Sequence, residues 1–134
     1  ETPPIELSPT LVNVLDCVAI MTHATVKKQG TRKLKSIVEI VRVSPDGIAL
    51  TNTPFIWSPR DDKFYFKKDS KVFEKISLRY GVTKEELLKE FEARRRLLYE
   101  LSRRKIFGFE RVQKEINEYY KNPKAILSRY GIKV

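Results

Sequence analysis

Residues 55–66 read Phe-Ile-Trp-Ser-Pro-Arg-Asp-Asp-Lys-Phe-Tyr-Phe, and this stretch carries the clearest structural signal in the chain. Its centre, Ser58–Asp62, has the proline and paired aspartates of a turn. The flanking segments, Phe55–Trp57 and Lys63–Lys67, are rich in aromatic residues, which favour strands. The sequence therefore predicts two short strands joined by a turn, with the aromatic side chains in a core.

The other strands are predicted upstream of that turn. They are a buried strand over Leu15–Thr22, a hairpin connection over Lys27–Thr31, a half-exposed strand over Ile37–Val43, a turn over Ser44–Gly47 and a short strand over Ile48–Asn52. Nearer the start of the chain, Ser8 and Pro9 suit the N-cap and first position of a short helix over Thr10–Val14. The first half of the chain is thus predicted to be antiparallel β structure.

The second half of the chain changes to helical periodicity. Asp69 and Ser70 begin a predicted helix that Gly81 ends, and Thr83-Lys-Glu-Glu86 is a capping box for a longer helix that reaches Lys105. Two shorter helices follow, one over Phe109–Tyr119 and one that begins at Asn122-Pro123 and stops at Gly131. The prediction is an α+β fold, with a β-rich domain over residues 1–68 and a small helical bundle over residues 69–134.

Positive charge is unevenly distributed along the chain. The 134 residues have a net charge of +10, but residues 1–26 contain three acids and no lysine or arginine. Residues 27–43 contain six bases and one acid, and residues 69–134 contain seventeen bases and ten acids. Such a surface favours nucleic acid, anionic lipid or an acidic protein face, and composition does not choose between them. No apolar run approaches the ~18 residues that would span a bilayer.

Groups that would carry catalysis or bind a metal are scarce in this sequence. There is no Gly-x-x-x-x-Gly-Lys-Ser/Thr motif, and one histidine with one cysteine cannot form a His/Cys metal cluster. Cys17 lies in an apolar run and is expected to be a small buried residue, and His23 ends that run without a nameable catalytic partner. Asp61 and Asp62 are more typical of a solvated turn than of a metal site. We assign no catalytic, cofactor-binding or metal-binding residue.

The predicted long helix carries two groups of arginines. They are Arg94, Arg95, Arg96, Arg103 and Arg104, and these five are the candidate partner-binding residues. At ~100° per residue, positions nine apart lie about half a turn from each other, so the groups do not form one stripe. Glu90, Glu92 and Glu100 are spaced to pair with some of them. The pattern suits a solvated face or a surface for an acidic partner, and suits nucleic acid less, because no aromatic residues alternate with the bases.

Four segments resemble the archaeal secretion ATPases, the family that drives type II secretion and the assembly of archaeal type IV pili and the archaellum. They are Pro3–Leu11, similar to the segment after the family's His box; Leu15–Met21, similar to the next core strand; Arg32-Lys-Leu-Lys-Ser-Ile-Val-Glu-Ile40, similar to an Arg-Arg-x-x-x-Ile-x-Glu-Ile strand; and Phe55–Phe64, similar to a Phe-x-Trp-Asp-Pro-x-x-Asp-x-Phe motif. Ser58 stands where that motif usually has aspartate. The helical tail, including Ile116–Pro123, is also similar, so the resemblance covers nearly the whole chain.

The resemblance implies a hexameric cytoplasmic ATPase, peripheral to the inner face of the cell membrane, that uses ATP and Mg²⁺ to act on a membrane platform protein. The first half of the chain would be the end of its RecA-like motor domain. In that family the Walker A loop, Asp box, Walker B acids and His box precede the matched segments, and His23 does not match the His-box histidine. The chain, which begins at Glu1, is then expected to be a C-terminal fragment that does not turn over ATP alone.

Two other functions remain open from the sequence. The net charge suits a nucleic-acid-binding module, but the scattered arginines match no known nucleic-acid-binding motif, so no nucleic-acid partner is expected. A free-standing adaptor that pairs with an ATPase encoded elsewhere would carry the same motifs.

Overall fold

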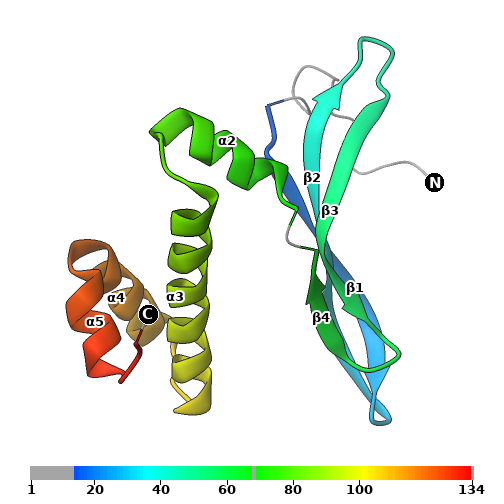
Figure 1. Ribbon diagram of the computed structural model, residues 1–134. Helices are drawn as coiled ribbons and strands as arrows, with labels where there is room; N and C mark the ends of the chain where they lie inside the picture. Colours follow the sequence, from blue (N-terminus) through cyan, green and yellow to red (C-terminus); the bar gives the residue numbers. More distant parts are fainter. Residues whose placement is uncertain (1–13, 68, 134) are drawn as a thin grey trace. The chain divides into compact units, whose positions relative to one another are not determined.

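A computed structural model describes residues 14–67 and 69–133, which form two compact units that meet between Arg79 and Tyr80. The first unit contains a four-stranded antiparallel sheet followed by a helix, and the second contains three helices (Figure 1). The predicted α+β fold, with a β-rich N-terminal half and helices after it, is confirmed. The predicted helix over Thr10–Val14 lies outside the described residues except for its last position, which is in a turn.

Each strand of the sheet pairs with its neighbour in sequence. The strands are β1 (Cys17–Val26), β2 (Gln29–Val43), β3 (Ala49–Ser58) and β4 (Lys63–Phe66), hydrogen-bonded in the order β1-β2-β3-β4. The helices are α2 (Lys71–Tyr80), α3 (Lys84–Arg103), α4 (Phe109–Lys121) and α5 (Pro123–Arg129). Strands β1 and β4 are therefore the two edges of the described sheet.

The predicted strand–turn–strand around Trp57 forms the β3–β4 hairpin. Phe55 and Phe66 are cross-strand partners whose rings stack with centroids 4.4 Å apart. Trp57 is buried, and its indole N–H donates to Asp62 Oδ1 at 2.7 Å. The expectation that the aromatic residues lie in a core is wrong for Phe64, which is 57% exposed. The short β4 strand has no neighbour beyond β3, so part of its aromatic surface faces solvent.

Strand β3 is continuous, although the sequence suggested two short strands. Pro54 lies inside β3 and is fully buried. The pairing register shifts between the Ile37–Phe55 pair and the Glu39–Asn52 pair, which places Pro54 at a bulge. A proline is tolerated at a bulge because its nitrogen has no hydrogen to give to the ladder.

The β1–β2 hairpin is longer and its turn is tighter than predicted. Only Lys27 and Lys28 form the turn, with φ of 50° and 64°, whereas Gly30, expected in the turn, lies in β2 opposite Thr25. The register of β2 with β3 begins at Ser36, so the outer part of the hairpin is a two-stranded ribbon, which extends past β3 and β4 in Figure 1.

Strand β1 is exposed, in contrast to the buried strand predicted over Leu15–Thr22. Val18 and Ile20 are 38% and 39% exposed, Met21 is 60% exposed, and Cys17, which was expected to be buried, is exposed as well. The physical reason is that β1 is an edge strand that contacts only β2 in the sheet. An apolar run predicts a strand but does not show whether another layer covers it.

One face of the sheet has partly exposed apolar side chains. Ile20, Ser36, Ile56 and Tyr65 are successive cross-strand partners across all four strands, so they lie on one face. Ile56 and Tyr65 are 42% and 48% exposed. We call Val18, Ile20, Ile56 and Tyr65 the open sheet face. On the opposite face, Phe73 of α2 packs edge-on against Phe66 at 6.2 Å.

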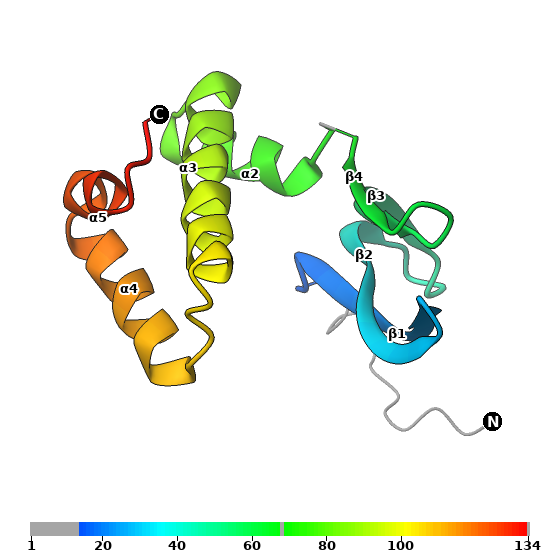
Figure 2. The ribbon, with the colours of Figure 1, turned by 90° about the horizontal axis from the view of Figure 1, so that it is seen from below.

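The second unit is a small helical bundle in which α4 and α5 lie beside α3 (Figures 1 and 2). Its core contains Leu97, Leu101, Tyr119, Ile126 and Tyr130, all no more than 5% exposed. The predicted helix signals are confirmed. Thr83 and Glu86 form the capping box of α3, and Gly131 adopts φ of 68° after α5. A positive φ there suits glycine because glycine has no Cβ.

Glu39 of β2 joins the sheet to the start of α2. Its carboxylate accepts hydrogen bonds from the Ser70 hydroxyl (2.5 Å), the Asn52 amide (2.8 Å) and the backbone N–H groups of Lys71 (2.8 Å) and Val72 (3.1 Å). Burial alone would raise the pKa of Glu39, but the four hydrogen bonds outweigh it and lower the pKa. A carboxylate from the sheet thus caps the N-terminus of the helix, which explains why α2 belongs to the first unit.

Replacement of Glu39 by glutamine should destabilise the first unit by about 2–3 kcal/mol, because one acceptor oxygen becomes a donor facing other donors. Urea unfolding followed by the fluorescence of Trp57, the only tryptophan, measures this change. The control is Glu74→Gln, an exposed carboxylate on α2, which should change stability by less than about 0.5 kcal/mol. Equal effects of the two substitutions would contradict the capping role.

Candidate functional site

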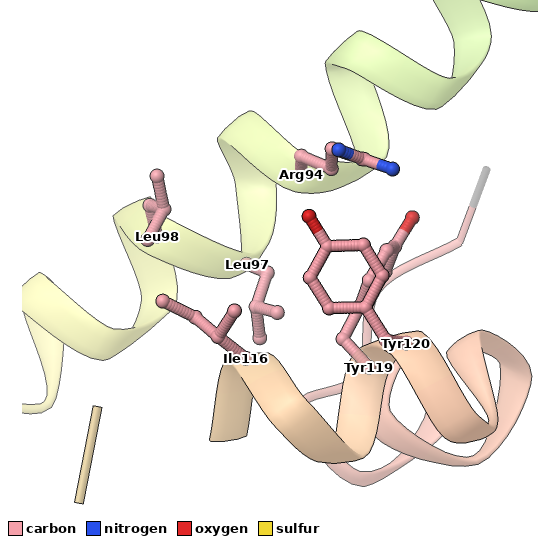
Figure 3. A pocket seen from close by; sticks show the side chains of 6 residues that line it. All are labelled: Arg94, Leu97, Leu98, Ile116, Tyr119 and Tyr120. Atoms are coloured by element: carbon pink, nitrogen blue, oxygen red, sulfur yellow. The ribbon is translucent and has the colours of Figure 1, made fainter. Parts of the chain in front are cut away.

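A small apolar pocket opens between α3 and α4 in the helical unit (Figure 3). Its lining residues are Arg94, Leu97, Leu98, Ile116, Tyr119 and Tyr120. The cavity measures about 140 Å³, close to the ~150 Å³ of an apolar cavity that holds a benzene ring. Leu98 and Tyr120 at its edge are 53% and 67% exposed. We call this pocket the α3–α4 groove, and it has room for one apolar side chain.

Helical spacing explains how two separate segments build the groove. Arg94, Leu97 and Leu98 lie three and four residues apart on α3, so they share one side of that helix. Ile116 and Tyr120 are likewise one turn apart on α4. The sequence predicted both helices, but only the packing of α3 against α4 brings these side chains to the same pocket.

A guanidinium and a phenol meet one carboxylate at the edge of the groove. The Arg94 guanidinium lies 5.7 Å from the ring centre of Tyr119 and 5.4 Å from that of Tyr120, and Figure 3 shows it above both rings. Arg94 Nε donates to Glu90 Oε1 at 2.9 Å, and the Tyr119 hydroxyl donates to the same oxygen at 2.7 Å. Glu90 therefore holds α3 and α4 together and fixes the position of Arg94.

These contacts shift the pKa values of both acids. Burial, together with the hydrogen bond to Glu90, raises the pKa of Tyr119 to about 12. The hydrogen bond from Tyr119, with a second from Arg94, lowers the pKa of Glu90 in spite of its partial burial. The groove edge thus carries a positive guanidinium, a negative carboxylate and a neutral phenol over the ordinary pH range.

Arg95 and Arg96 do not line the groove. Both pair with Glu92, Arg95 at 2.6 Å and Arg96 at 3.0 Å, and Arg96 also donates to the carbonyl oxygen of Lys133 at 2.7 Å. The hydrogen bonds from Arg95 and Arg96 lower the pKa of Glu92 to about 2. The predicted pairing at helical spacing is confirmed here.

Arg103 and Arg104 share Glu100 in the same way, at 2.9 Å and 3.3 Å. The Arg104 guanidinium also lies 4.7 Å from the ring centre of Tyr130. Of the five candidate arginines, Arg94 is therefore the one that the structure combines with an apolar pocket. All five retain side-chain exposures between 40% and 58%, so they remain accessible to solvent.

The sequence analysis did not identify Glu115, which is buried in the helical unit. Its side chain is 1% exposed and lies between Arg111 (3.0 Å) of α4 and Arg129 (3.3 Å) of α5. Two guanidinium partners compensate the charge of this buried carboxylate, which would be costly to leave unpaired. The sequence signal that could have identified Glu115 is its position between Val112 and Tyr119, on the apolar side of α4 that faces the core.

The other residues considered from the sequence, His23, Asp61 and Asp62, belong to the first unit. His23 is in β1 opposite Arg32. Asp62 accepts the Trp57 N–H and pairs with Lys33 at 3.1 Å, while Asp61 accepts the backbone N–H of Lys63 at 3.2 Å. Within residues 14–67 and 69–133, no three His, Cys, Asp or Glu side chains are grouped as metal ligands. In the same ranges, no helix has the length and apolar character needed to cross a bilayer.

No protein-family model matches the chain. An uncharacterized protein of Methanocaldococcus jannaschii is 30% identical over 118 residues, which cover 87% of this chain and 43% of that protein. The chain thus spans less than half the length of this archaeal relative. Since the match is longer than either compact unit, it includes parts of both.

Removal of the Tyr119 hydroxyl should loosen α4 from α3. We expect Tyr119→Phe to destabilise the helical unit by about 1–2 kcal/mol, because a buried hydrogen bond to a carboxylate is lost. Thermal unfolding followed by circular dichroism measures the change. Tyr120→Phe is the matched control, since its ring is 67% exposed, and it should have little effect. If Tyr120→Phe lowered the stability as much as Tyr119→Phe does, the hydrogen bond from Tyr119 to Glu90 would not account for the loss.

The raised pKa of Tyr119 also predicts sensitivity to alkali. A folded-state pKa above the ordinary value of 10 favours the protonated phenol in the folded state. The associated stability is complete below pH 10 and is lost as the pH rises towards about 12. Denaturation at a series of alkaline pH values should therefore show a shallower loss of stability for Tyr119→Phe than for the unchanged chain. Identical slopes for the two proteins would contradict this assignment.

Proposed function

We propose that this chain is the non-catalytic C-terminal part of an ATPase that powers protein secretion or the assembly of a type IV pilus or archaellum. In this role the first unit completes the motor domain of a hexamer, and the helical unit binds a protein partner such as the membrane platform protein. The ordered resemblance of Pro3–Leu11, Arg32–Ile40 and Phe55–Phe64 to that family supports this reading. The match to part of a longer archaeal protein is compatible with it.

The open sheet face is the observation that carries the proposal. Val18, Ile20, Ile56 and Tyr65 present apolar surface on one side of β1, β3 and β4, while Phe66 on the other side contacts Phe73 of α2. Burial of apolar area stabilises a protein by about 25 cal/mol per Å², so a sheet face of this kind is normally covered by a second layer. We assign that layer to the remainder of a longer polypeptide, since the archaeal relative extends beyond the matched region.

The described residues do not fit ATP and Mg²⁺. A phosphate cradle needs several glycine or backbone N–H groups converging on one loop, whereas Gly30, Gly47, Gly81, Gly108 and Gly131 lie singly in different elements. Mg²⁺ in nucleotide sites is held by one or two carboxylates together with the phosphates, so it would bind where the nucleotide binds. In the proposed ATPase, nucleotide chemistry therefore belongs to another part of the polypeptide.

The α3–α4 groove supplies the partner surface. It offers an apolar pocket beside the exposed Arg94, and residues 80–134 contain fourteen bases and eight acids. Such a surface suits an amphipathic segment that inserts one apolar side chain and carries acidic residues next to it. An acidic cytoplasmic segment of the platform protein has this chemistry.

ATP binding by the isolated chain and the effects of Ile56→Lys test the proposal. The isolated chain should bind no ATP at micromolar concentration, and the substitution should change its stability by no more than about 1 kcal/mol, because the position faces solvent. In the longer polypeptide the same lysine would be buried between layers, so we expect ATP hydrolysis to be lost. Leu78→Lys is the matched control, since Leu78 is 87% exposed, and it should leave hydrolysis unchanged.

Micromolar ATP binding by the isolated chain would contradict the proposed division of labour. Unchanged ATP hydrolysis in the longer Ile56→Lys protein would show that the open sheet face is not covered by the motor domain.

A further inference from the structure

The outer part of the β1–β2 hairpin has charge of one sign. Residues 22–35 contain five lysines and arginines and no aspartate or glutamate. The bases are Lys27, Lys28, Arg32, Lys33 and Lys35. We call residues 22–35 the basic ribbon. Its two strands pair with each other, whereas pairing of β2 with β3 begins at Ser36, so the ribbon is accessible from several sides.

Most of this charge forms no salt bridge with the residues that the structure describes. Lys33 pairs with Asp62 at 3.1 Å and is only 25% exposed. Lys27, Lys28, Arg32 and Lys35 are exposed, and none of them forms a salt bridge with a residue in the described ranges. The arginines of α3 differ in this respect, because each of them pairs with a glutamate of its own helix.

The two lysines at the turn of the ribbon adopt an unfavourable backbone conformation. Lys27 and Lys28 have φ of 50° and 64°, the left-handed region in which a Cβ atom is unfavourable. A two-residue hairpin turn of this type is most favourable with Asn-Gly. The two lysines therefore occupy the tip of the ribbon although uncharged residues would fit its backbone better.

Apolar surface and an open hollow of about 370 Å³ accompany the bases. Met21 pairs with Leu34 and His23 with Arg32, and these pairs alternate along the strands, so the four side chains lie on one face of the ribbon. Met21 is 60% exposed on that face. His23 and Arg32 also line a hollow, together with Ala24, Thr25, Gly30 and Thr31. Its guanidinium, imidazole and hydroxyl groups can donate to phosphate oxygens.

We propose that the basic ribbon binds the anionic surface of a lipid bilayer, with Lys27 and Lys28 among the headgroups and Arg32 donating to a lipid phosphate. Exposed apolar and basic side chains on one face are the chemistry of interfacial binding. Nucleic acid fits less well, because residues 22–35 contain no Phe, Tyr or Trp, and His23 is the one ring there on which a base could stack. The inference stands on the ribbon and does not depend on the proposed ATPase.

Vesicle sedimentation with the full chain tests this inference. The chain should bind phosphatidylcholine vesicles that contain phosphatidylglycerol, should not bind vesicles of phosphatidylcholine alone, and should dissociate as salt is added. The variant Lys27→Asn with Lys28→Gly removes two charges and installs the preferred turn sequence, so the ribbon stays folded. A base near an anionic membrane contributes about fivefold in binding, so the variant should bind about 25-fold more weakly.

The matched control is Lys89→Gln with Lys114→Gln, which removes the same charge from exposed positions of α3 and α4. It should retain most of the binding, whereas an equal loss in both variants would overturn the assignment to the ribbon. Vesicle binding by the turn variant at the strength of the unchanged chain would overturn it as well. A parallel arm uses a mixed-sequence DNA duplex at the same salt. If the chain binds DNA more tightly than the vesicles and the turn variant loses that binding, the ribbon would be reassigned to nucleic acid.

Discussion

The first unit depends on one buried carboxylate. Glu39 receives donors from residues 31 to 33 positions later in the chain, and these include the first two N–H groups of α2. The carboxylate satisfies donors that a helix N-terminus cannot satisfy itself, and the sheet gains a helix that brings Phe73 to Phe66. An apolar side chain at position 39 would leave those donors without an acceptor and glutamine would keep only one of the two acceptor oxygens, so the carboxylate is what joins the helix to the sheet.

The helical unit uses carboxylates in the same manner. Glu90 connects α3 to α4 through Tyr119, and Glu115 connects α4 to α5 through Arg129. Both carboxylates accept from arginine, so part of the basic composition pairs with the acids that join the helices, of which Glu115 is buried and Glu90 is 47% exposed. The arginines of this unit are therefore mainly structural partners, with Arg94 as the one that also faces an apolar pocket. By contrast, Lys27, Lys28, Arg32 and Lys35 of the first unit form no salt bridge with a residue in the described ranges.

Most of the secondary structure could be predicted because its signals are local. Thr83 and Glu86 lie within one turn of each other, and the aromatic residues around Trp57 identify a hairpin. The role of Glu39 could not be predicted, because its partners are defined by folding and not by spacing. Exposure of β1 could not be predicted either, since an apolar run looks the same with or without a covering layer. The arginine cluster was visible in sequence, but the choice of Arg94 depends on tyrosines contributed by another helix.

The consecutive order of the strands has a kinetic consequence. Each hairpin of the sheet closes between segments that follow one another, and hairpins of this kind form in about 1–10 μs. Folding that relies on such local contacts is fast, because little loop entropy is lost before contacts are gained. The late event in this unit is then the docking of α2, whose contact with Glu39 closes the longest loop among the described hydrogen bonds of the sheet. Until that step the carboxylate remains hydrated, so the sheet can assemble first and acquire its buried charge last.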